Sequence, residues 1–141
     1  MRSIVTNSAA ETEQFAQELA SSLKPNDVLA FSGGLGMGKT TFVRGLARGL
    51  GSSDEVSSPT FSLVHEYRGT PKLYHFDMYR VTSFDDLYST GFFDYLETGA
   101  ILAIEWSENI EGVLPDNTIR VMFERLEEEK RRITVEGGGR F

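Results

Sequence analysis

The amino-acid sequence predicts an α/β fold with a mixed β-sheet, and three patterns support this prediction. An apolar segment at residues 28–31 is followed by a glycine-rich segment at 33–40 and then by apolar residues at helical spacing. Residues 100–104 are continuously apolar, which is typical of a strand buried on both faces. Strand-like segments within 61–76 and within 118–135 are joined by turns and predict antiparallel hairpins.

The first elements along the chain are a strand and a helix. Residues 4–6 are suited to a short strand. Ser8 and Glu11 fit a capping box, in which the serine caps the helix and the glutamate reaches back to its start. A turn at 24–27 then leads into the strand at 28–31. The helix itself is predicted by an apolar stripe of Phe15, Ala16, Leu19, Ala20 and Leu23.

The second helix follows the glycine-rich segment. It is expected to end near Gly49 and Gly51, because glycine is common at helix C-termini. A polar loop is expected over 51–60. The apolar face of this helix consists of Phe42, Val43, Leu46, Ala47 and Leu50.

The remaining elements alternate between hairpins and short helices. Residues 61–67 and 73–76 form the first predicted hairpin. Ser83 caps a short helix, and Gly91 interrupts it before a second apolar face. The C-terminal hairpin turns at the acidic segment 127–130, which is more typical of a solvated turn than of a metal site.

Residues 33–40 match the phosphate-binding pattern G-x-x-x-x-G-K-[ST] at every fixed position. Glycines let the backbone adopt positive φ and direct N–H groups toward phosphate oxygens. Lys39 is expected to contact the β- and γ-phosphates and the Thr40 hydroxyl to bind Mg²⁺, while the helix N-terminus favours the same anion. The sequence therefore predicts a nucleotide-binding site. The residues of the pattern are Gly33, Gly34, Leu35, Gly36, Met37, Gly38, Lys39 and Thr40.

The composition predicts one acidic domain, residues 1–141, and excludes several classes of protein. The chain has no cysteine, which excludes a disulfide scaffold and thiolate metal sites and is compatible with the cytoplasm. There is no apolar run of about 18 residues, so no membrane span is expected. With a net charge of −7, the chain is a poor candidate for gripping nucleic-acid phosphates by itself.

Nucleotide hydrolases of this class need a further carboxylate at a strand end, to hold Mg²⁺ or to orient water. Two acids follow apolar strands here, Asp77 after 73–76 and Glu105 after 100–104. Ligands of α/β sheets bind beyond the carboxyl ends of parallel strands, so both positions suit the site if their strands run parallel to 28–31. The alternative is that one of them is a surface acid.

Four other features admit two interpretations each. The loop at 57–60 is either a switch that responds to the γ-phosphate or a turn capped by hydroxyls. Trp106 is either a core aromatic or a wall of the nucleotide pocket. Arg80 is either a phosphate contact or the ion-pair partner of an acid, and the second interpretation is favoured. His65 and His75 are more typical of strand side chains than of metal ligands.

Four segments together resemble a known family. They are GGLGMGKTTF at 33–42, SPTF at 58–61, HFDMYR at 75–80 and IEWS at 104–107. Their order and spacing are similar to those of the TsaE family, which are small bacterial P-loop ATPases required to make threonylcarbamoyladenosine at position 37 of tRNA. The resemblance covers nearly the whole chain, and only the first segment is generic.

The resemblance implies a three-layer P-loop NTPase fold with a mixed sheet, and ATP or ADP with Mg²⁺ as cofactors. It implies that Thr40 and Glu105 coordinate Mg²⁺ and that Asp77 acts near the γ-phosphate or its attacking water. It also implies a switch-like loop that includes Thr60 and a position near the nucleotide for Trp106. The implied catalytic residues are Lys39, Asp77 and Thr60, and the implied nucleotide-binding residues are 33–40 with Thr41 and Trp106.

The implied partner is the TsaB–TsaD heterodimer, with tRNA engaged only through that complex and no contact with a membrane. Ser8 and Thr12, together with Arg131 and Arg132, match the family more loosely as nucleotide contacts. Two other functions compete with an energy-coupling ATPase. A small-molecule or nucleoside kinase needs an acceptor pocket and cationic lid residues. The other alternative is a GTPase switch or a non-catalytic binding module. A GTPase switch needs a guanine-reading Asn-Lys-x-Asp segment, which the sequence lacks.

Overall fold

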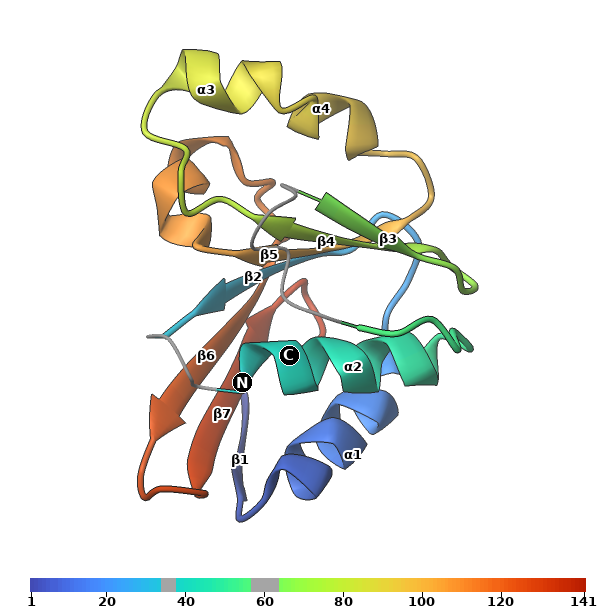
Figure 1. Cartoon of the computed structure of the whole chain (residues 1–141), viewed down its shortest axis with the longest axis vertical. Coiled ribbons are helices and arrows are strands. Elements are labelled where there is room, and N and C mark those ends of the chain that lie inside the picture. The colour runs from blue at the N-terminus through green and yellow to red at the C-terminus, as the bar shows by residue number, and fades with distance from the viewer. Residues whose placement is uncertain (34–37, 57–63) are drawn as a thin grey trace.

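A mixed β-sheet forms the centre of the computed structural model (Figure 1). The structure describes residues 1–33, 38–56 and 64–141. Within them the sheet has seven strands in the order β1-β7-β6-β2-β5-β4-β3. The strands are β1 (Arg2–Thr6), β2 (Val28–Ser32), β3 (Val64–Tyr67), β4 (Leu73–Asp77), β5 (Ile101–Glu105), β6 (Ile119–Arg125) and β7 (Arg131–Gly137).

The four inner strands run parallel and the outer strands run antiparallel to their neighbours. β2 lies between β6 and β5 and is parallel to both, and β4 is parallel to β5. The hairpins β3–β4 and β6–β7 add the antiparallel edges, and β1 pairs with β7. Both hairpins predicted from the sequence are confirmed, and so is the buried character of β5, in which Ile101–Ile104 are at most 1% exposed.

Helices cover both faces of the sheet and produce three layers (Figure 1). Helices α1 (Ala9–Ala20) and α2 (Lys39–Gly49) pack on one face, where Phe42 and Leu46 join Leu29 and Phe31 in one core. Helices α3 (Phe84–Ser89) and α4 (Phe92–Tyr95) and the 3₁₀ helix η1 (Ser107–Val113) contribute to a second core on the opposite face. The predicted α/β class and mixed sheet are therefore confirmed.

Local signals in the sequence fix the starts of two helices. The Ser8 Oγ accepts a hydrogen bond from the Glu11 N–H at 3.2 Å, and the Ser83 Oγ accepts one from the Asp86 N–H at 3.1 Å. The Glu11 carboxylate accepts a hydrogen bond from the Asn7 N–H at 3.1 Å, one residue before the position that a capping box predicts.

Helix α2 lies very close to α1 because two glycines line the contact. A Cβ on Gly45 would lie 2.3 Å from the Glu13 carbonyl oxygen, and one on Gly49 would lie 2.5 Å from the Ala20 Cβ. The helix ends at Gly49, near the predicted position, and Gly51 follows with a φ of 85°. This contact holds the helix whose first residue is Lys39. No helix among the described residues is long and apolar enough to cross a membrane.

Candidate nucleotide-binding site

The carboxyl ends of three parallel strands meet at one edge of the sheet. Asp77 at the end of β4 is the register partner of Glu105 at the end of β5. β5 is in turn the neighbour of β2, which ends at Ser32. The Met78 N–H donates to the Glu105 carbonyl at 3.0 Å and extends the pairing beyond the strand ends. The two acids predicted from the sequence are therefore brought together beside the start of the glycine-rich segment.

The two ends of the glycine-rich segment both have backbone conformations that favour glycine. Gly33 has a φ of 125°, and a Cβ there would lie 2.8 Å from the Phe123 carbonyl oxygen. Gly38 has a φ of 93° and occupies the N-cap position of α2. The segment therefore connects the end of β2 to the N-terminus of α2, and a helix N-terminus favours binding of an anion such as phosphate. Gly34, Leu35, Gly36 and Met37 lie outside the described residues.

The side chain of Lys39, the first residue of α2, reaches the first glycine of the segment. This side chain is buried, and the Nζ donates a hydrogen bond to the Gly33 carbonyl at 2.6 Å. The same Nζ lies 5.7 Å from the centroid of the Trp106 ring, within the range of a cation–π contact. The positive charge of Lys39 is therefore held between the Gly33 carbonyl and the face of the Trp106 ring.

The side chains at the strand ends face α2. Leu73 of β4, with Ile101 and Ala103 of β5, belongs to the core beneath α2. Because side chains alternate along a strand, Asp77 and Glu105 lie on the same face as these residues. The two carboxylates thus occupy the layer that contains the N-terminus of α2.

Each carboxylate has a defined hydrogen-bond partner. The Asp77 Oδ1 accepts a hydrogen bond from the Tyr79 N–H at 2.9 Å. The Glu105 Oε2 lies 2.5 Å from the Nε2 of His75, a fully buried side chain of β4. Burial raises the pKa of Asp77, and the nearby charge of Glu105 adds to this effect, while the Tyr79 N–H opposes it. Asp77 is therefore a stronger base than an ordinary surface aspartate.

Trp106 lies between the site and the surface. It adopts a left-handed backbone conformation, with a φ of 58° and a ψ of 39°, directly after Glu105. Its ring packs against Tyr79 at 4.9 Å between centroids, and it also contacts the core on the α3 face. Trp106 thus packs against the core, as the first interpretation expects, and its role as a wall of the nucleotide pocket stays a prediction.

The donor set at this edge suits Mg²⁺. Thr40 in the first turn of α2 and the carboxylates of Asp77 and Glu105 supply hard oxygen donors. Across residues 1–33, 38–56 and 64–141 there is no group of three or more His, Cys, Asp or Glu side chains that could enclose a metal. This is compatible with Mg²⁺, which takes one or two carboxylates and completes its shell with water and substrate phosphate.

Comparison with known proteins identifies the family. Residues 6–133 match the family model described as "Threonylcarbamoyl adenosine biosynthesis protein TsaE". The chain belongs to the TsaE family. A relative from Treponema pallidum, named tRNA threonylcarbamoyladenosine biosynthesis protein TsaE, is 37% identical over 131 residues, which are 93% of this chain and 97% of the relative. A Bacillus subtilis relative of the same name is 38% identical over 130 residues, 92% of this chain and 81% of the relative.

A solved structure agrees with this assignment. The crystal structure of Bacillus subtilis YdiB superposes with a TM-score of 0.82 at 34% identity, over 99% of this chain and 88% of that one. The three-layer arrangement is therefore shared by this TsaE family member and a solved structure.

Other residues that resemblance to TsaE assigns to the site are placed as follows. Thr41 is half-buried in the first turn of α2. Thr12 lies beside the glycine-rich segment, because a Cβ on Gly38 would be 4.0 Å from its Cγ2. The Ser8 side chain caps α1. Residues 57–63, which include Thr60 and the start of the strand predicted at 61–67, lie outside the described residues.

The arginines of the TsaE resemblance differ in their contacts. Arg80 is exposed, and no described residue forms an ion pair with it, so the predicted pairing with an acid is not found in the described part of the chain. The Arg131 Nη1 donates to the Glu128 carbonyl at 2.9 Å, and the Arg132 Nη1 donates to Glu124 at 3.0 Å. Both side chains thus stabilise the β6–β7 hairpin.

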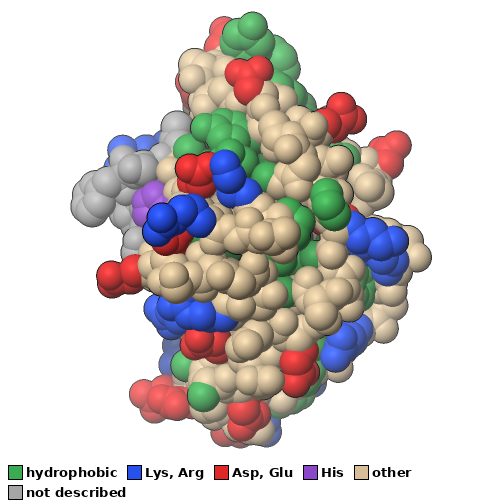
Figure 2. Space-filling view, turned by 90° about the vertical axis from the view of Figure 1, so that its right-hand side faces the viewer, with side chains coloured by type: hydrophobic (Ala, Val, Ile, Leu, Met, Phe, Trp, Pro, Cys, Tyr) green, Lys and Arg blue, Asp and Glu red, His purple; other side chains and the backbone are tan. Residues whose placement is uncertain are grey.

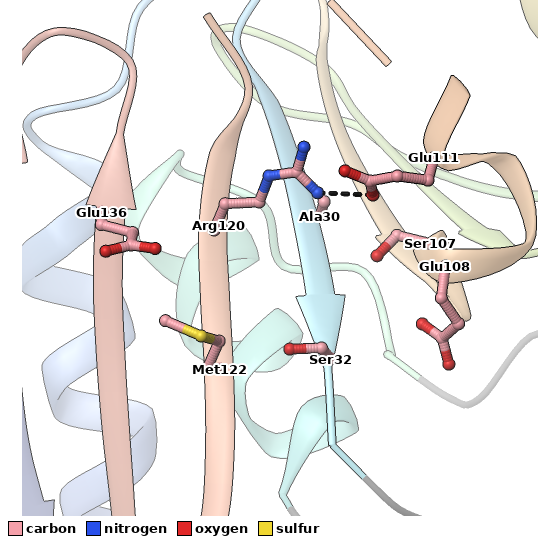
Figure 3. Close-up of a pocket in the computed structure, with 8 residues that line it drawn as sticks. All are labelled: Ala30, Ser32, Ser107, Glu108, Glu111, Arg120, Met122 and Glu136. Carbon is pink, nitrogen blue, oxygen red and sulfur yellow. Dashed lines mark hydrogen bonds and ion pairs between the residues drawn. The ribbon is translucent and has the colours of Figure 1, made fainter. Parts of the chain in front are cut away.

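A pocket of about 260 Å³ opens on the other face of the sheet (Figure 3). Figure 3 shows Arg120 reaching from β6 toward Glu111 on η1, where its Nη1 donates to the Oε2 at 2.6 Å. The residues of β2 and β6 that line this pocket alternate along each strand with the residues that face α2. The pocket therefore lies on the opposite face of the sheet from the candidate nucleotide-binding site. It is lined by Ala30, Ser32, Ser107, Glu108, Glu111, Arg120, Met122 and Glu136.

Sequence reasoning missed His75 as part of the site. It was expected to be an ordinary strand side chain, and it is indeed a buried strand residue with a hydrogen-bond partner. The signal that points to the site is the two-residue period of β4, which sets His75 on the same face as Asp77. Its partner Glu105 is 30 residues away in sequence, and only the pairing of β4 with β5 brings the two together.

Proposed function

We propose that this TsaE family member is a Mg²⁺-dependent ATPase in the cytoplasm that acts in the threonylcarbamoyl modification of adenosine 37 in tRNA. The observation that carries the proposal is the convergence of Lys39, the N-terminus of α2 and two carboxylates at one edge of the sheet. The names of the relatives supply the pathway, tRNA threonylcarbamoyladenosine biosynthesis.

Each group at this edge has a separate task in the proposal. Lys39 neutralises negative charge on the β- and γ-phosphates, and the amides at the start of α2 add hydrogen bonds to the same oxygens. Thr40 and Glu105 hold Mg²⁺, which screens the charge that develops on the phosphates. Because catalysis of this kind depends mainly on positioning and electrostatics, the groups need to be fixed before ATP binds. The short contact of Lys39 with Gly33 supports such preorganisation.

Asp77 orients the attacking water in this proposal. One of its oxygens is engaged by the Tyr79 N–H, which fixes the carboxylate relative to the end of β4. Burial raises the pKa of Asp77, so its affinity for a proton of water exceeds that of an exposed aspartate. This property suits a group that accepts a hydrogen bond from water during hydrolysis.

The charge of the protein supports a partner that carries the tRNA. The net charge is −7, and Figure 2 shows Lys and Arg interspersed with Asp and Glu across the face it displays. Binding to nucleic-acid phosphates requires clustered positive charge. The proposed partner is the TsaB–TsaD heterodimer, and the proposed role of the ATP cycle is to drive that complex, with the loop containing Thr60 as the coupling element.

The test measures phosphate release from ATP with and without purified TsaB–TsaD. We expect slow hydrolysis by the protein alone, faster hydrolysis with the pair and docking that depends on ATP or ADP. The Thr60→Ala variant is expected to reduce stimulation more than nucleotide binding. Equal hydrolysis and docking in all nucleotide states would exclude energy coupling. Transfer of phosphate to a small molecule or nucleoside instead of water would identify a kinase.

A further inference from the structure

The buried side chain of His75 contacts Glu105 but has no task in the proposed function. It lies in the middle of β4 and is 0% exposed. Its Nε2 is 2.5 Å from the Glu105 Oε2, and its ring is 6.2 Å from that of Tyr67 on the neighbouring strand. Histidine is thus present where its neighbours along the same face, Leu73 and Ala103, are apolar.

The direction of the hydrogen bond follows from the chemistry of the two groups. An ionised carboxylate is only an acceptor, so the His75 Nε2 carries the hydrogen and donates it to Glu105. The other ring nitrogen, Nδ1, is buried and has no hydrogen-bond partner among the residues that the structure describes. Nδ1 is therefore best left as a bare lone pair, because a second buried N–H without an acceptor would add a desolvation cost. This arrangement places the donated hydrogen on Nε2.

The arrangement costs stability that an apolar residue would not cost. Burial of a polar atom without a partner is unfavourable, whereas a leucine or methionine at this position leaves nothing unsatisfied. What His75 adds in return is one strong hydrogen bond to a single carboxylate oxygen of Glu105. The feature that distinguishes His75 from its apolar neighbours is thus its effect on Glu105.

We propose that His75 is a positioning residue that orients Glu105 for Mg²⁺, an inference that rests on the proposed function of the site. The terminal torsion of a glutamate is broad, so an unrestrained carboxylate samples many orientations. The bond from the buried His75 engages Oε2 and leaves Oε1 to act as the metal ligand in this proposal. Groups that hydrogen-bond to a metal ligand in this way raise metal affinity by restricting the ligand.

This inference separates metal binding from nucleotide binding. The hydrogen bond of His75 goes to Glu105, whereas that of Lys39 goes to Gly33. Loss of the imidazole is therefore expected to alter the metal ligand and to spare the contacts of Lys39 with phosphate. The expected signature is weaker metal binding with unchanged affinity for ADP in the absence of metal. A merely structural role for His75 in β4 would affect both affinities and the melting temperature together.

The experiment measures Mn²⁺ binding to the full chain with saturating ADP, by the electron paramagnetic resonance signal of free Mn²⁺. His75→Leu removes the donor and keeps an apolar side chain of similar size. His75→Gln is the matched control, because its Nε2 donates from nearly the same position. We expect His75→Leu to weaken Mn²⁺ binding by about 10–100-fold, and His75→Gln to restore it to within a few-fold of the wild type. Metal-free ADP binding is expected to stay within about twofold in both variants.

Three results would overturn the inference. They are unchanged Mn²⁺ affinity in His75→Leu, an equal loss in both variants, or a parallel loss of metal-free ADP binding in a folded variant. If His75→Leu does not fold, His75→Met repeats the donor-free measurement with an unbranched side chain. If the wild-type protein binds ADP but does not bind Mn²⁺ together with it, both this inference and the proposed Mg²⁺ site are excluded. If only the Mn²⁺ affinity of His75→Leu is unchanged, the inference is excluded and the proposed Mg²⁺ site is not.

Discussion

Replacement of Gly45 by alanine is expected to destabilise the fold, although alanine is the better helix former. Gly45 lies within α2 at its contact with α1. A Cβ at this position would lie 2.3 Å from the Glu13 carbonyl oxygen and 2.6 Å from the Ala16 Cβ. Both of these atoms belong to α1, and no change of rotamer moves either of them away. The added methyl group is therefore accommodated only if the two helices separate.

The magnitude follows from two opposing effects. Alanine in place of glycine favours an isolated helix by about 1 kcal/mol. Overpacking of a well-packed core costs about 1–3 kcal/mol, and a clash with backbone atoms belongs at the upper end of that range. The net loss is then about 2 kcal/mol. For a chain of 141 residues, an unfolding entropy of about 2.1 cal/mol/K per residue converts this loss into a fall in Tm of roughly 7 °C.

Thermal unfolding followed by circular dichroism in the absence of nucleotide measures the effect. Gly112→Ala is the control, because a Cβ on Gly112 would have no heavy atom within 4 Å. We expect Gly112→Ala to unfold within about 0.5 kcal/mol of the wild type. A Gly45→Ala protein that melts at or above the wild-type temperature would show that α1 and α2 do not need the close approach seen in the structure.

Three further predictions concern the carboxylates and Lys39. Lys39→Ala is expected to weaken ADP binding by about 1.5–3 kcal/mol, or roughly 10–150-fold, because a charge-assisted contact is lost. Wild-type affinity for ADP in calorimetry would contradict the assignment of Lys39 to the nucleotide site. Glu105→Gln is expected to raise the Mg²⁺ concentration needed for hydrolysis, whereas Asp77→Asn is expected to lower turnover and leave ADP binding largely intact. Equal, mild effects of both variants would indicate surface acids. The third prediction concerns the pH dependence of stability. Because burial raises the pKa of Asp77, the folded protein binds the proton of this carboxyl group more tightly than the unfolded chain does. The stability gained from protonated Asp77 is present below the unfolded pKa and is lost as the pH rises through the folded pKa. In EDTA, Asp77→Asn is therefore expected to melt above the wild type at pH 7, with a gap that closes in acid. Arg68 lowers the pKa of Asp54 to about 2, so Asp54→Asn is expected to melt below the wild type at pH 7, with a loss that disappears as the pH falls from 4 toward 2. Changes in melting temperature of the same sign at pH 7 in Asp77→Asn and Asp54→Asn would refute the opposite pKa shifts assigned to these two carboxyl groups.

Features that depend on neighbouring residues could be predicted from the sequence. Helix caps at Ser8 and Ser83 and the hairpin turns are local, because they involve residues two to four positions apart. The position of the candidate nucleotide-binding segment was predictable for the same reason, since Gly33, Gly38 and Lys39 belong to one short stretch of sequence.

Features that depend on strand order could not be predicted in this way. The sequence does not show that β5 lies between β2 and β4, and this order is what joins Asp77 to Glu105. The close contact of α1 with Gly45 also depends on tertiary packing, because glycine in a helix gives no local sign of what lies opposite. The 3₁₀ helix η1 was missed because it is short and has no apolar period.

Three departures from ordinary protein chemistry lie at the same edge of the sheet. Trp106 has a positive φ of 58°, which is unusual for a bulky side chain. Burial and a neighbouring acid raise the pKa of Asp77, and the Nδ1 of His75 is buried with no partner in the described part of the chain. Each departure is unfavourable for folding, and each involves a residue in contact with Glu105 or adjacent to it in the sheet or the chain. Costs that concentrate around one side chain are more typical of a functional site than of a structural strand end, where an apolar or solvated residue avoids all three. Glu105 is therefore the residue around which the local structure is organised. Among the variants at this edge of the sheet, we expect Glu105→Gln to weaken the proposed Mg²⁺ site the most.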